Sequence, residues 1–318
     1  MKLPEIYPFG GLESGQISFF QSRKEAKNAV SETENAVLAA KYKIKGAPES
    51  FKWDYLKKSD ELVTSMDIYK EGFTLLPHAV IGINGDEGAG KTQLVFDLAV
   101  LYGVDLVHDI KTGGQALRQA GEKLRKRHFF GREKVGDMAD QAGFVERTDE
   151  DDNALDNAQF SWVENPSEKP KLVDSRLIGL AIYSIKHKKT DLKAASFYII
   201  SSAKERWHRL AERTGESEEE VETKTNERRK LDIERYTRLY KGKKRFEIFG
   251  DEINPHNSAY YDRVIDNTYR DREMAIRAMH EYLVETGLVG KKAEIQGPTE
   301  VYDRERHDLE HQVWPEAN

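Results

Sequence analysis

The 318-residue sequence contains no cysteine, which excludes disulfide bonds and metal sites built on thiolate ligands. It also lacks a long apolar run, because no stretch approaches the roughly 20 apolar residues that cross a bilayer. Residues 1–6 are too short and too polar to form the apolar part of a signal peptide. We therefore expect a cytoplasmic protein with no part in the membrane.

Neither sign of charge dominates the chain. It has 50 Lys and Arg against 56 Asp and Glu, and its formal net charge is −6. This balance gives no overall attraction to nucleic acid, although a local basic patch could still bind a polyanion. The length leaves room for one large α/β domain and an accessory piece.

Residues 85–92 form the most specific motif. They read Gly-Asp-Glu-Gly-Ala-Gly-Lys-Thr, a complete G-x-x-x-x-G-K-[ST] phosphate-binding loop. An apolar run at residues 78–83 precedes the loop, and residues 93–102 are typical of a buried helix that ends at Gly103. Because this motif requires a strand before it and a helix after it, the sequence predicts a P-loop protein that binds a nucleoside triphosphate.

The residue types in this loop explain why it binds phosphate. Gly85, Gly88 and Gly90 allow backbone N–H groups to turn inward around phosphate oxygens, and the following helix presents the positive end of its dipole. Lys91 can reach the β- and γ-phosphates, and the Thr92 hydroxyl can ligate Mg²⁺. We therefore expect ATP and Mg²⁺ as cofactors.

Short apolar runs separated by helical stretches continue after the loop. The expected strands are residues 104–107, 171–174, 196–200 and 262–266, and one expected helix is residues 175–185. Strands that alternate with helices predict an α/β fold with a parallel sheet covered on both faces. We expect residues 1–72 to form a helical extension, residues 73–287 the P-loop domain and residues 288–318 a charged tail.

Two helices rich in charge are predicted between the last two strands. Each begins with a capping box, and the first ends at a glycine: Ser202-x-x-Glu205, Gly215 and Ser217-x-x-Glu220. In the second helix, Arg228, Asp232 and Arg235 are spaced by four and three residues and share one face. Spacing alone favours a solvent-exposed helix stabilised by i,i+4 ion pairs.

Four stretches, taken in order, resemble the cytidylate kinase family of nucleoside monophosphate kinases. They are the loop, Asp-Ile-Lys-Thr-Gly-Gly-Gln-Ala-Leu-Arg at 109–118, Val-Asp-Ser-Arg-Leu-Ile-Gly at 173–179, and the charged segment from Ser201 to Thr268. The Arg-x-x-x-Asp-x-x-Arg core at 228–235 is the most discriminating part. The resemblance runs from about residue 78 to residue 285.

The resemblance implies a P-loop nucleoside monophosphate kinase fold, with a parallel five-stranded sheet flanked by helices. An acceptor-binding insertion is implied at about residues 108–168, and a helical lid at about residues 203–245. The implied activity is transfer of a phosphoryl group from ATP to a pyrimidine nucleoside monophosphate, with CMP or dCMP before UMP or dTMP. Since the family completes its chemistry within one chain, we expect a monomer.

The resemblance also implies roles for individual side chains. The implied catalytic residues are Lys91, Arg176, Arg228 and Arg235. The implied contacts to the acceptor are Thr112, Arg118, Arg176, Arg206 and Asp232, and those to Mg²⁺ are Thr92 and Asp174. Arginines on a closing lid would balance charge during transfer and exclude water. A second interpretation of Asp174 is that it caps the following helix.

Two alternatives to a pyrimidine nucleotide kinase remain open. Ser175, Leu177 and Leu231 depart from the family pattern, and they bear on the acceptor rather than on the loop. One alternative is transfer to a hydroxyl of a modified nucleotide or of a base in DNA, with Asp109 as the base and the basic stretch 111–134 against the polyanion. The other is a nucleotide-binding regulatory protein without transferase activity.

Overall fold

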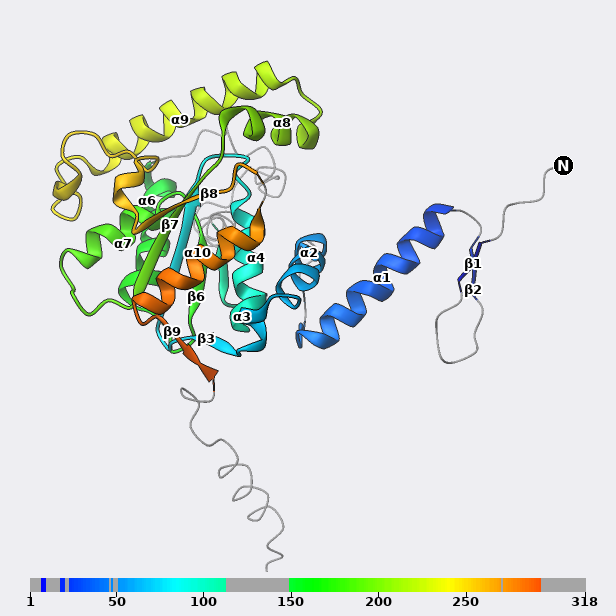
Figure 1. The fold of residues 1–318 in the computed structure, drawn as a ribbon. Coiled ribbons are helices and arrows are strands. Elements are labelled where there is room, and N and C mark those ends of the chain that lie inside the picture. The colour runs from blue at the N-terminus through cyan, green and yellow to red at the C-terminus, as the bar shows by residue number, and fades with distance from the viewer. Residues whose placement is uncertain are drawn as a thin grey trace, which may run out of the picture.

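A computed structural model describes residues 7–9, 18–20, 23–45, 47, 51–112, 149–269 and 271–292 of the chain. Its centre is a sheet in the order β5-β6-β4-β7-β8, in which neighbouring strands are parallel (Figure 1). The strands are β4 (Val80–Gly85), β5 (Ile110–Thr112), β6 (Lys171–Asp174), β7 (Ala194–Ile200) and β8 (Arg263–Asp266). This parallel five-stranded sheet, flanked by helices, confirms the predicted α/β fold class.

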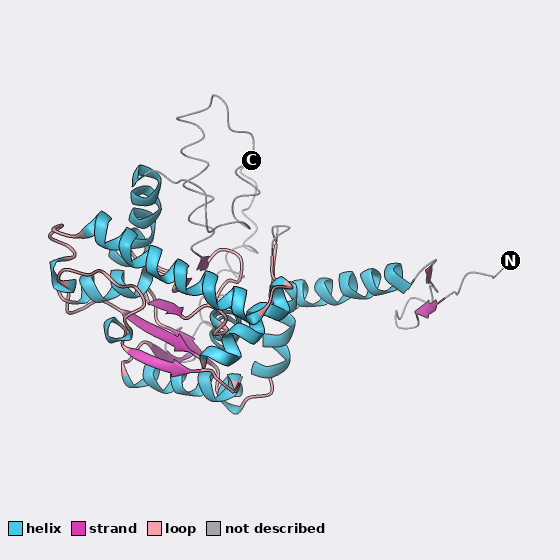
Figure 2. Ribbon diagram, turned by 90° about the horizontal axis from the view of Figure 1, so that it is seen from above, coloured by secondary structure: helices cyan, strands magenta, loops and turns pink. Residues whose placement is uncertain are grey.

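Helices cover both faces of the sheet (Figures 1 and 2). The first face carries α2 (Trp53–Val63), α4 (Lys91–Tyr102) and α10 (Arg272–Glu285), and the second carries α6 (Asp149–Glu164) and α7 (Ile178–Lys186). Side chains of β4 alternate between them, so that Ile81 and Ile83 pack on the first face and Val80 packs on the second. Among the helices of the described ranges, none has the length and apolarity needed to cross a bilayer.

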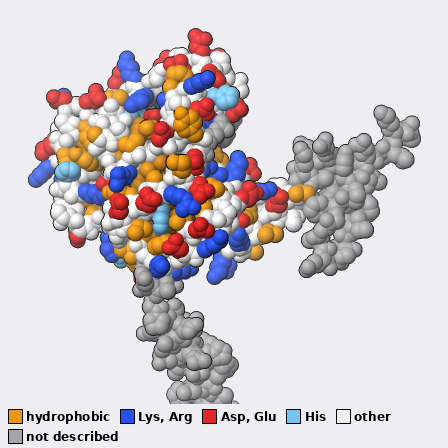
Figure 3. All heavy atoms as spheres, in the orientation of Figure 1, with side chains coloured by type: hydrophobic (Ala, Val, Ile, Leu, Met, Phe, Trp, Pro, Cys, Tyr) orange, Lys and Arg blue, Asp and Glu red, His pale blue; other side chains and the backbone are white. Residues whose placement is uncertain are grey.

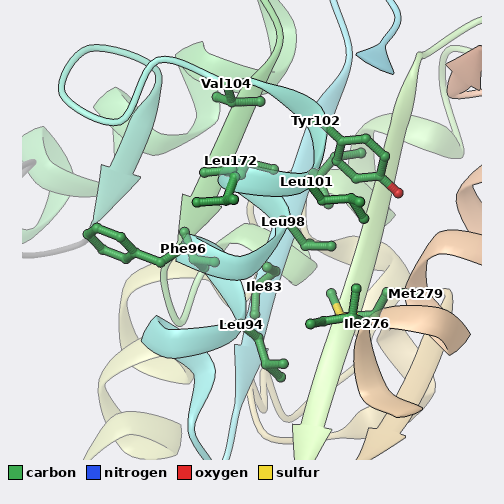
Figure 4. Close-up of a cluster of buried hydrophobic side chains, with 14 of the residues drawn as sticks. Ile83, Leu94, Phe96, Leu98, Leu101, Tyr102, Val104, Leu172, Ile276 and Met279 are labelled. Carbon is green, nitrogen blue, oxygen red and sulfur yellow. The ribbon is translucent and has the colours of Figure 1, made fainter. Parts of the chain in front are cut away.

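The two faces pack closely for different reasons. On the second face, a Cβ at Gly82 would lie 2.7 Å from Ile178 and 2.8 Å from Ile182, so the glycine lets α7 approach the strand. On the first face, Leu94 of α4 and Met279 of α10 are fully buried in one apolar cluster (Figure 4). The strand β4, which leads into the glycine loop, is therefore held between two packed layers.

Part of the predicted N-terminal extension belongs to this core. Leu56 and Val63 of α2 have no exposed surface and lie in the same cluster as α4. At the other end of the domain, β3 (Phe73–Leu75) pairs antiparallel with β9 (Val289–Lys291). The packed unit thus runs from α2 to β9, and the boundaries predicted after residues 72 and 287 both fall inside it.

Within the packed unit, α3 (Asp67–Lys70) adds Ile68 to the first-face cluster. The remaining elements lie before this unit or over the sheet. They are β1 (Tyr7–Phe9), β2 (Ser18–Phe20), α1 (Arg23–Lys41), α8 (Ala203–Thr214), α9 (Glu218–Tyr240) and two 3₁₀ turns, Glu247–Phe249 and Ser258–Tyr260. Leu38 near the end of α1 packs on the core, and Lys41 and Tyr42 bond to Asp60 of α2. The rest of α1 extends away from the body of the molecule (Figures 1 and 2).

One predicted strand is wrong. Residues 104–107 lie in an irregular segment and a turn, where the Asp105 carboxylate accepts hydrogen bonds from the N–H groups of Val107 (2.9 Å) and His108 (3.0 Å). An Asp side chain that bonds the backbone two and three residues onward favours a turn. The strand is β5, which begins at Ile110, and the other predicted strands are confirmed to within two residues.

The two charged helices begin and end as the sequence predicted. The Ser202 hydroxyl accepts a hydrogen bond from the N–H of Glu205, and α8 ends at Gly215 in the left-handed conformation. Ser217 and Glu220 form both bonds of a capping box at the start of α9.

The structure describes only the two ends of the predicted acceptor-binding insertion, residues 108–168. Residues 113–148, with Arg118 and most of the basic stretch 111–134, lie outside the described residues. At the carboxyl end of the insertion, α6 packs Phe160 and Val163 on the second face of the sheet.

Candidate functional site

The glycine loop leaves the carboxyl end of β4 and leads into α4. Gly85 has a φ of 147°, and a Cβ there would lie 2.0 Å from the carbonyl oxygen of Ile199, so the position requires glycine. Gly88 and Gly90 also have positive φ, 76° and 89°. A loop of this kind at the N-terminus of a helix is a ready anion-binding site, in agreement with the predicted phosphate loop.

Lys91 is the first residue of α4 and folds back over the loop. Its Nζ donates hydrogen bonds to the carbonyl oxygens of Gly85 (2.9 Å) and Asp86 (2.7 Å). Burial lowers the pKa of Lys91, while the carboxylates of Asp174 and Glu87 act in the opposite direction. An ammonium group held over its own loop is placed to meet the phosphates that such a loop binds.

Thr92 and Asp174 come together where β4 and β6 end. Asp174 pairs in register with Ile83, and the Thr92 hydroxyl donates to the Asp174 carboxylate at 2.8 Å. Burial raises the pKa of Asp174, while Lys91 and Thr92 act to lower it. The N-cap of α7 is Leu177, so the structure does not support the alternative role of Asp174 as a helix cap.

These two oxygens fit a Mg²⁺ ion that is bound together with a nucleotide. Mg²⁺ usually takes one or two carboxylates and completes its shell with phosphate oxygens and water. Within the described residues, no group of three or more His, Cys, Asp and Glu side chains could hold a metal. A cation at Thr92 and Asp174 would therefore depend on the nucleotide for further ligands.

Arg176 follows β6 and connects the loop to α9. Its Nη1 donates to both carboxylate oxygens of Asp232 (2.8 and 2.6 Å), and its Nη2 donates to Glu87 (2.6 Å). His256 lies 3.3 Å from the same Asp232 carboxylate. Burial acts to lower the pKa of Arg176, but Asp232 and Glu87 raise it and the net shift is upward. Two of the predicted acceptor contacts, Arg176 and Asp232, are thus bonded to each other.

Further arginines from α8 and α9 approach the two acidic residues of the loop. Arg228 lies 3.0 Å from Glu87, while Arg206 and Arg229 lie 3.7 and 3.8 Å from Asp86. Arg206 and Arg228 were predicted from the sequence. Arg229 was not, because its position beside Arg228 in a charged helix gave no signal of its own.

Arg209 is a second arginine that the sequence did not single out. Its guanidinium donates to the carbonyl oxygens of Gly88 (3.4 Å) in the loop and Thr268 (2.7 Å) after β8. In the same segment, the Asn267 side-chain amide donates to the carbonyl oxygen of Ala89 at 2.8 Å. Arg209 therefore fixes the segment after β8 against the loop, and its spacing of three from Arg206 on α8 was the available signal.

Arg235 faces a different part of the molecule from Arg228. It donates to Asp156 of α6 at 3.1 Å, its guanidinium carbon lies 4.7 Å from the Tyr236 ring centre, and Tyr240 bonds to the same carboxylate. A helix rises 1.5 Å per residue, so Arg235 lies about 10 Å along α9 from Arg228. Sharing one face does not bring both residues to the loop, and a catalytic role for Arg235 stays a prediction.

The remaining predicted residues lie on β5 or outside the described residues. Thr112 pairs in register with Asp174, at the edge of the sheet where the loop begins. Asp109 precedes β5 at the amino ends of the strands, away from the loop, and its carbonyl accepts a hydrogen bond from the N–H of Leu172 at 3.0 Å. The hypothesis that Asp109 is a general base at the loop is therefore wrong. Arg118 lies in the segment that the structure does not describe.

The chain matches no protein-family model and no curated protein. It resembles an uncharacterized protein from Eubacterium ventriosum ATCC 27560, with 16% identity and a TM-score of 0.41, over 64% of this chain and 98% of that one. For shikimate kinase from Bacteroides thetaiotaomicron the identity is 11%, the TM-score 0.37, and the coverage 64% and 98%. For TT1252 from Thermus thermophilus the identity is 15% and the TM-score is 0.36, and the match covers 65% of this chain and 98% of that one. Likenesses this distant carry no argument about function.

Proposed function

We propose that this protein is an ATP:nucleoside monophosphate phosphotransferase that acts on a pyrimidine nucleotide such as CMP or dCMP. The observation that carries the proposal is the convergence of arginines on the phosphate loop. Arg176 comes from the end of β6, Arg206 from α8 and Arg228 from α9, and all three reach the loop's acidic residues. Phosphoryl transfer needs positive charge around the transferred group, whereas simple nucleotide binding does not need arginines from three elements.

In this proposal the chain positions two phosphates and shields them from water. Lys91 binds oxygens of the β- and γ-phosphates, and Thr92 and Asp174 would hold Mg²⁺, which supplies further positive charge there. An oxygen of the acceptor phosphate attacks the γ-phosphorus in line as the bond to the β–γ bridging oxygen breaks, which leaves ADP. Arg176 and Arg228 bind the transferred group. Since the acceptor phosphate is already ionised near neutral pH, the transfer requires no general base.

A contact between Asp232 and the cytosine base is implied by the sequence resemblance, and it requires Asp232 to share its carboxylate with Arg176, which donates to both of its oxygens. Burial acts to raise the pKa of this carboxyl, but His256 and Arg176 lower it, and the net shift is downward. An ionised carboxylate is a suitable acceptor for the exocyclic amino group of cytosine. The preference for a pyrimidine otherwise depends on the sequence resemblance.

The alternative acceptors are less well supported. Transfer to a hydroxyl is left without its proposed base, because Asp109 lies at the amino ends of the strands and the loop lies at their carboxyl ends. Basic and acidic side chains are interspersed on the face drawn in Figure 3, so that face offers no continuous basic surface to a polyanion. A regulatory protein without transferase activity would still bind ATP but would turn over none.

The test is ATP consumption with Mg²⁺ across a panel of ribo- and deoxyribonucleoside monophosphates. We expect turnover with CMP or dCMP, and we expect Lys91→Ala to lower it at least about a hundredfold, as loss of a charge-stabilising group does. Lys241→Ala is the control, since Lys241 pairs with Asp251 on the surface and its loss should leave turnover unchanged. ATP binding without turnover on any monophosphate would contradict the proposal, and polynucleotides would then be tried as acceptors.

A further inference from the structure

Two acidic residues within the phosphate loop point at the arginines of the lid. Glu87 lies 2.6 Å from Arg176 and 3.0 Å from Arg228. Asp86 accepts a hydrogen bond from the Tyr198 hydroxyl at 3.0 Å, and its carboxylate lies further from its arginines, at 3.7 and 3.8 Å. Glu87 therefore makes the closer arginine contacts of the two.

The position of Glu87 gives these contacts a particular consequence. Its backbone belongs to the loop that would wrap the donor phosphates. Its side chain pairs with Arg176, which follows β6, and with Arg228 of α9. The Glu87 and Arg176 side chains are only 23% and 26% exposed, so water screens their attraction less than it would on an open surface. A carboxylate held by two arginines offers them the same kind of partner as a bound phosphate, negatively charged acceptor oxygens, but with one charge instead of two.

We propose that Glu87 is an internal substitute for a phosphate group, which occupies Arg176 and Arg228 and holds α9 to the loop until a phosphate displaces it. This inference rests on the proposed function, because it assumes that a phosphate of the donor or acceptor binds these arginines. Glu87 is then a specificity-determining residue. An anion must compete with the carboxylate, so a dianionic phosphate binds in preference to a singly charged or neutral ligand.

The first test measures phosphate binding in the complex with ADP and Mg²⁺. Glu87→Gln keeps the size of the side chain and removes its charge. We expect the Kd for inorganic phosphate, measured by calorimetry, to fall about tenfold, which is the size of a typical coupling between linked binding events. The matched control is Glu164→Gln, which breaks another 2.6 Å pair, with Arg245, and should leave the Kd unchanged. A Kd for Glu87→Gln within twofold of the wild-type value would overturn the proposal.

The second test needs no nucleotide, so it separates this inference from the proposed function. If Glu87 holds α9 to the loop, amide hydrogen exchange around Arg228 should be several-fold faster in Glu87→Gln than in wild type. The same amides should exchange at the wild-type rate in Glu164→Gln. Unchanged exchange in Glu87→Gln would overturn the inference. If ADP and Mg²⁺ failed to bind the wild-type protein, the proposed function would fail, and exchange would still decide whether Glu87 secures α9.

Discussion

His280 is a buried histidine that links the stability of the fold to pH. It is 7% exposed, its Nδ1 lies 3.0 Å from the Tyr102 hydroxyl, and Phe73 packs edge-on against its ring. Burial lowers the pKa of His280, while Glu71 and Glu281 act to raise it. Between the lowered folded-state pKa and the ordinary value of about 6.5, the unfolded chain therefore binds a proton that the folded chain does not.

The sign of this linkage predicts a loss of stability in mild acid. The contribution of His280 is fully present above about pH 6.5 and is lost as the pH falls through the lower folded-state pKa. We expect the Tm of the wild-type protein to fall more between pH 7.5 and pH 5.5 than that of His280→Gln, measured by circular dichroism. If both proteins lost the same number of degrees, another group would be responsible.

Among single residues, the sequence predicted the positions of those site residues that neighbours along the chain hold in place. Lys91 and Thr92 belong to a contiguous motif, and Asp174 directly ends a strand, so each lies where its neighbours in the chain put it. The roles of Glu87 and Arg209 depend on where α8 and α9 cross the loop. Those contacts join residues more than a hundred positions apart, and local patterns do not encode them.

The helix α4 connects the loop to the N-terminal part of the chain through a buried polar cluster. Asp97 has no exposed surface and accepts hydrogen bonds from Ser59 of α2 (2.6 Å), Gln93 (3.3 Å) and Arg272 of α10 (3.1 Å from Nε). Gln93 directly follows Thr92 of the loop motif. One carboxylate thus holds three helices together immediately behind the phosphate loop.

Removing the charge of Asp97 should therefore destabilise the whole packed unit. Asp97→Asn leaves Arg272 without its carboxylate in a largely buried place, and breaking such a pair typically costs about 3 kcal/mol. We expect the urea midpoint to fall accordingly without a change in slope. Asp251→Asn, which breaks an exposed pair with Lys241, should leave the midpoint unchanged. Equal midpoints for wild type and Asp97→Asn would show that the cluster does not stabilise the fold.

Helices were predicted well where the spacing of apolar residues and the capping residues indicated the same boundaries. The Ser202 cap of α8 and the capping box of α9 begin both helices where expected, and Gly103 ends α4. Residues 104–107, which were predicted to form a strand, have alternating apolar residues, and the apolar side chains Val104 and Leu106 are buried. What decides its conformation is the hydrogen bonding of Asp105, which apolar pattern alone does not show.

The arrangement of the whole molecule divides the N-terminal region into two parts. Most of α1 extends away from the body, whereas α2 supplies Leu56 and Val63 to the core (Figure 2). The sequence separates the two helices by Gly46-Ala-Pro48, and the second carries large apolar side chains, Trp53, Tyr55 and Leu56, where the first carries mainly Ala and Val. The structure shows the consequence, since of these two helices only α2 packs along α4.

Two truncations test this division. Removal of residues 1–36 keeps Leu38 and the contacts with Asp60, so we expect a near-wild-type Tm and unchanged affinity for ADP with Mg²⁺. Removal of residues 1–72 deletes fully buried side chains, each of which typically contributes a few kcal/mol, and should abolish cooperative unfolding. A cooperative transition at the full-length Tm in the shorter protein would contradict the assignment of α2 to the core.

The proposed role of the arginines around the loop is transfer of a phosphoryl group between two nucleotides. The most direct measurement follows the labelled γ-phosphate of ATP in the presence of Mg²⁺ and CMP or dCMP. We predict that the label appears in the β-position of the nucleoside diphosphate and that Lys91→Ala abolishes this product. Label found only as inorganic phosphate, or only on an added polynucleotide, would contradict the account.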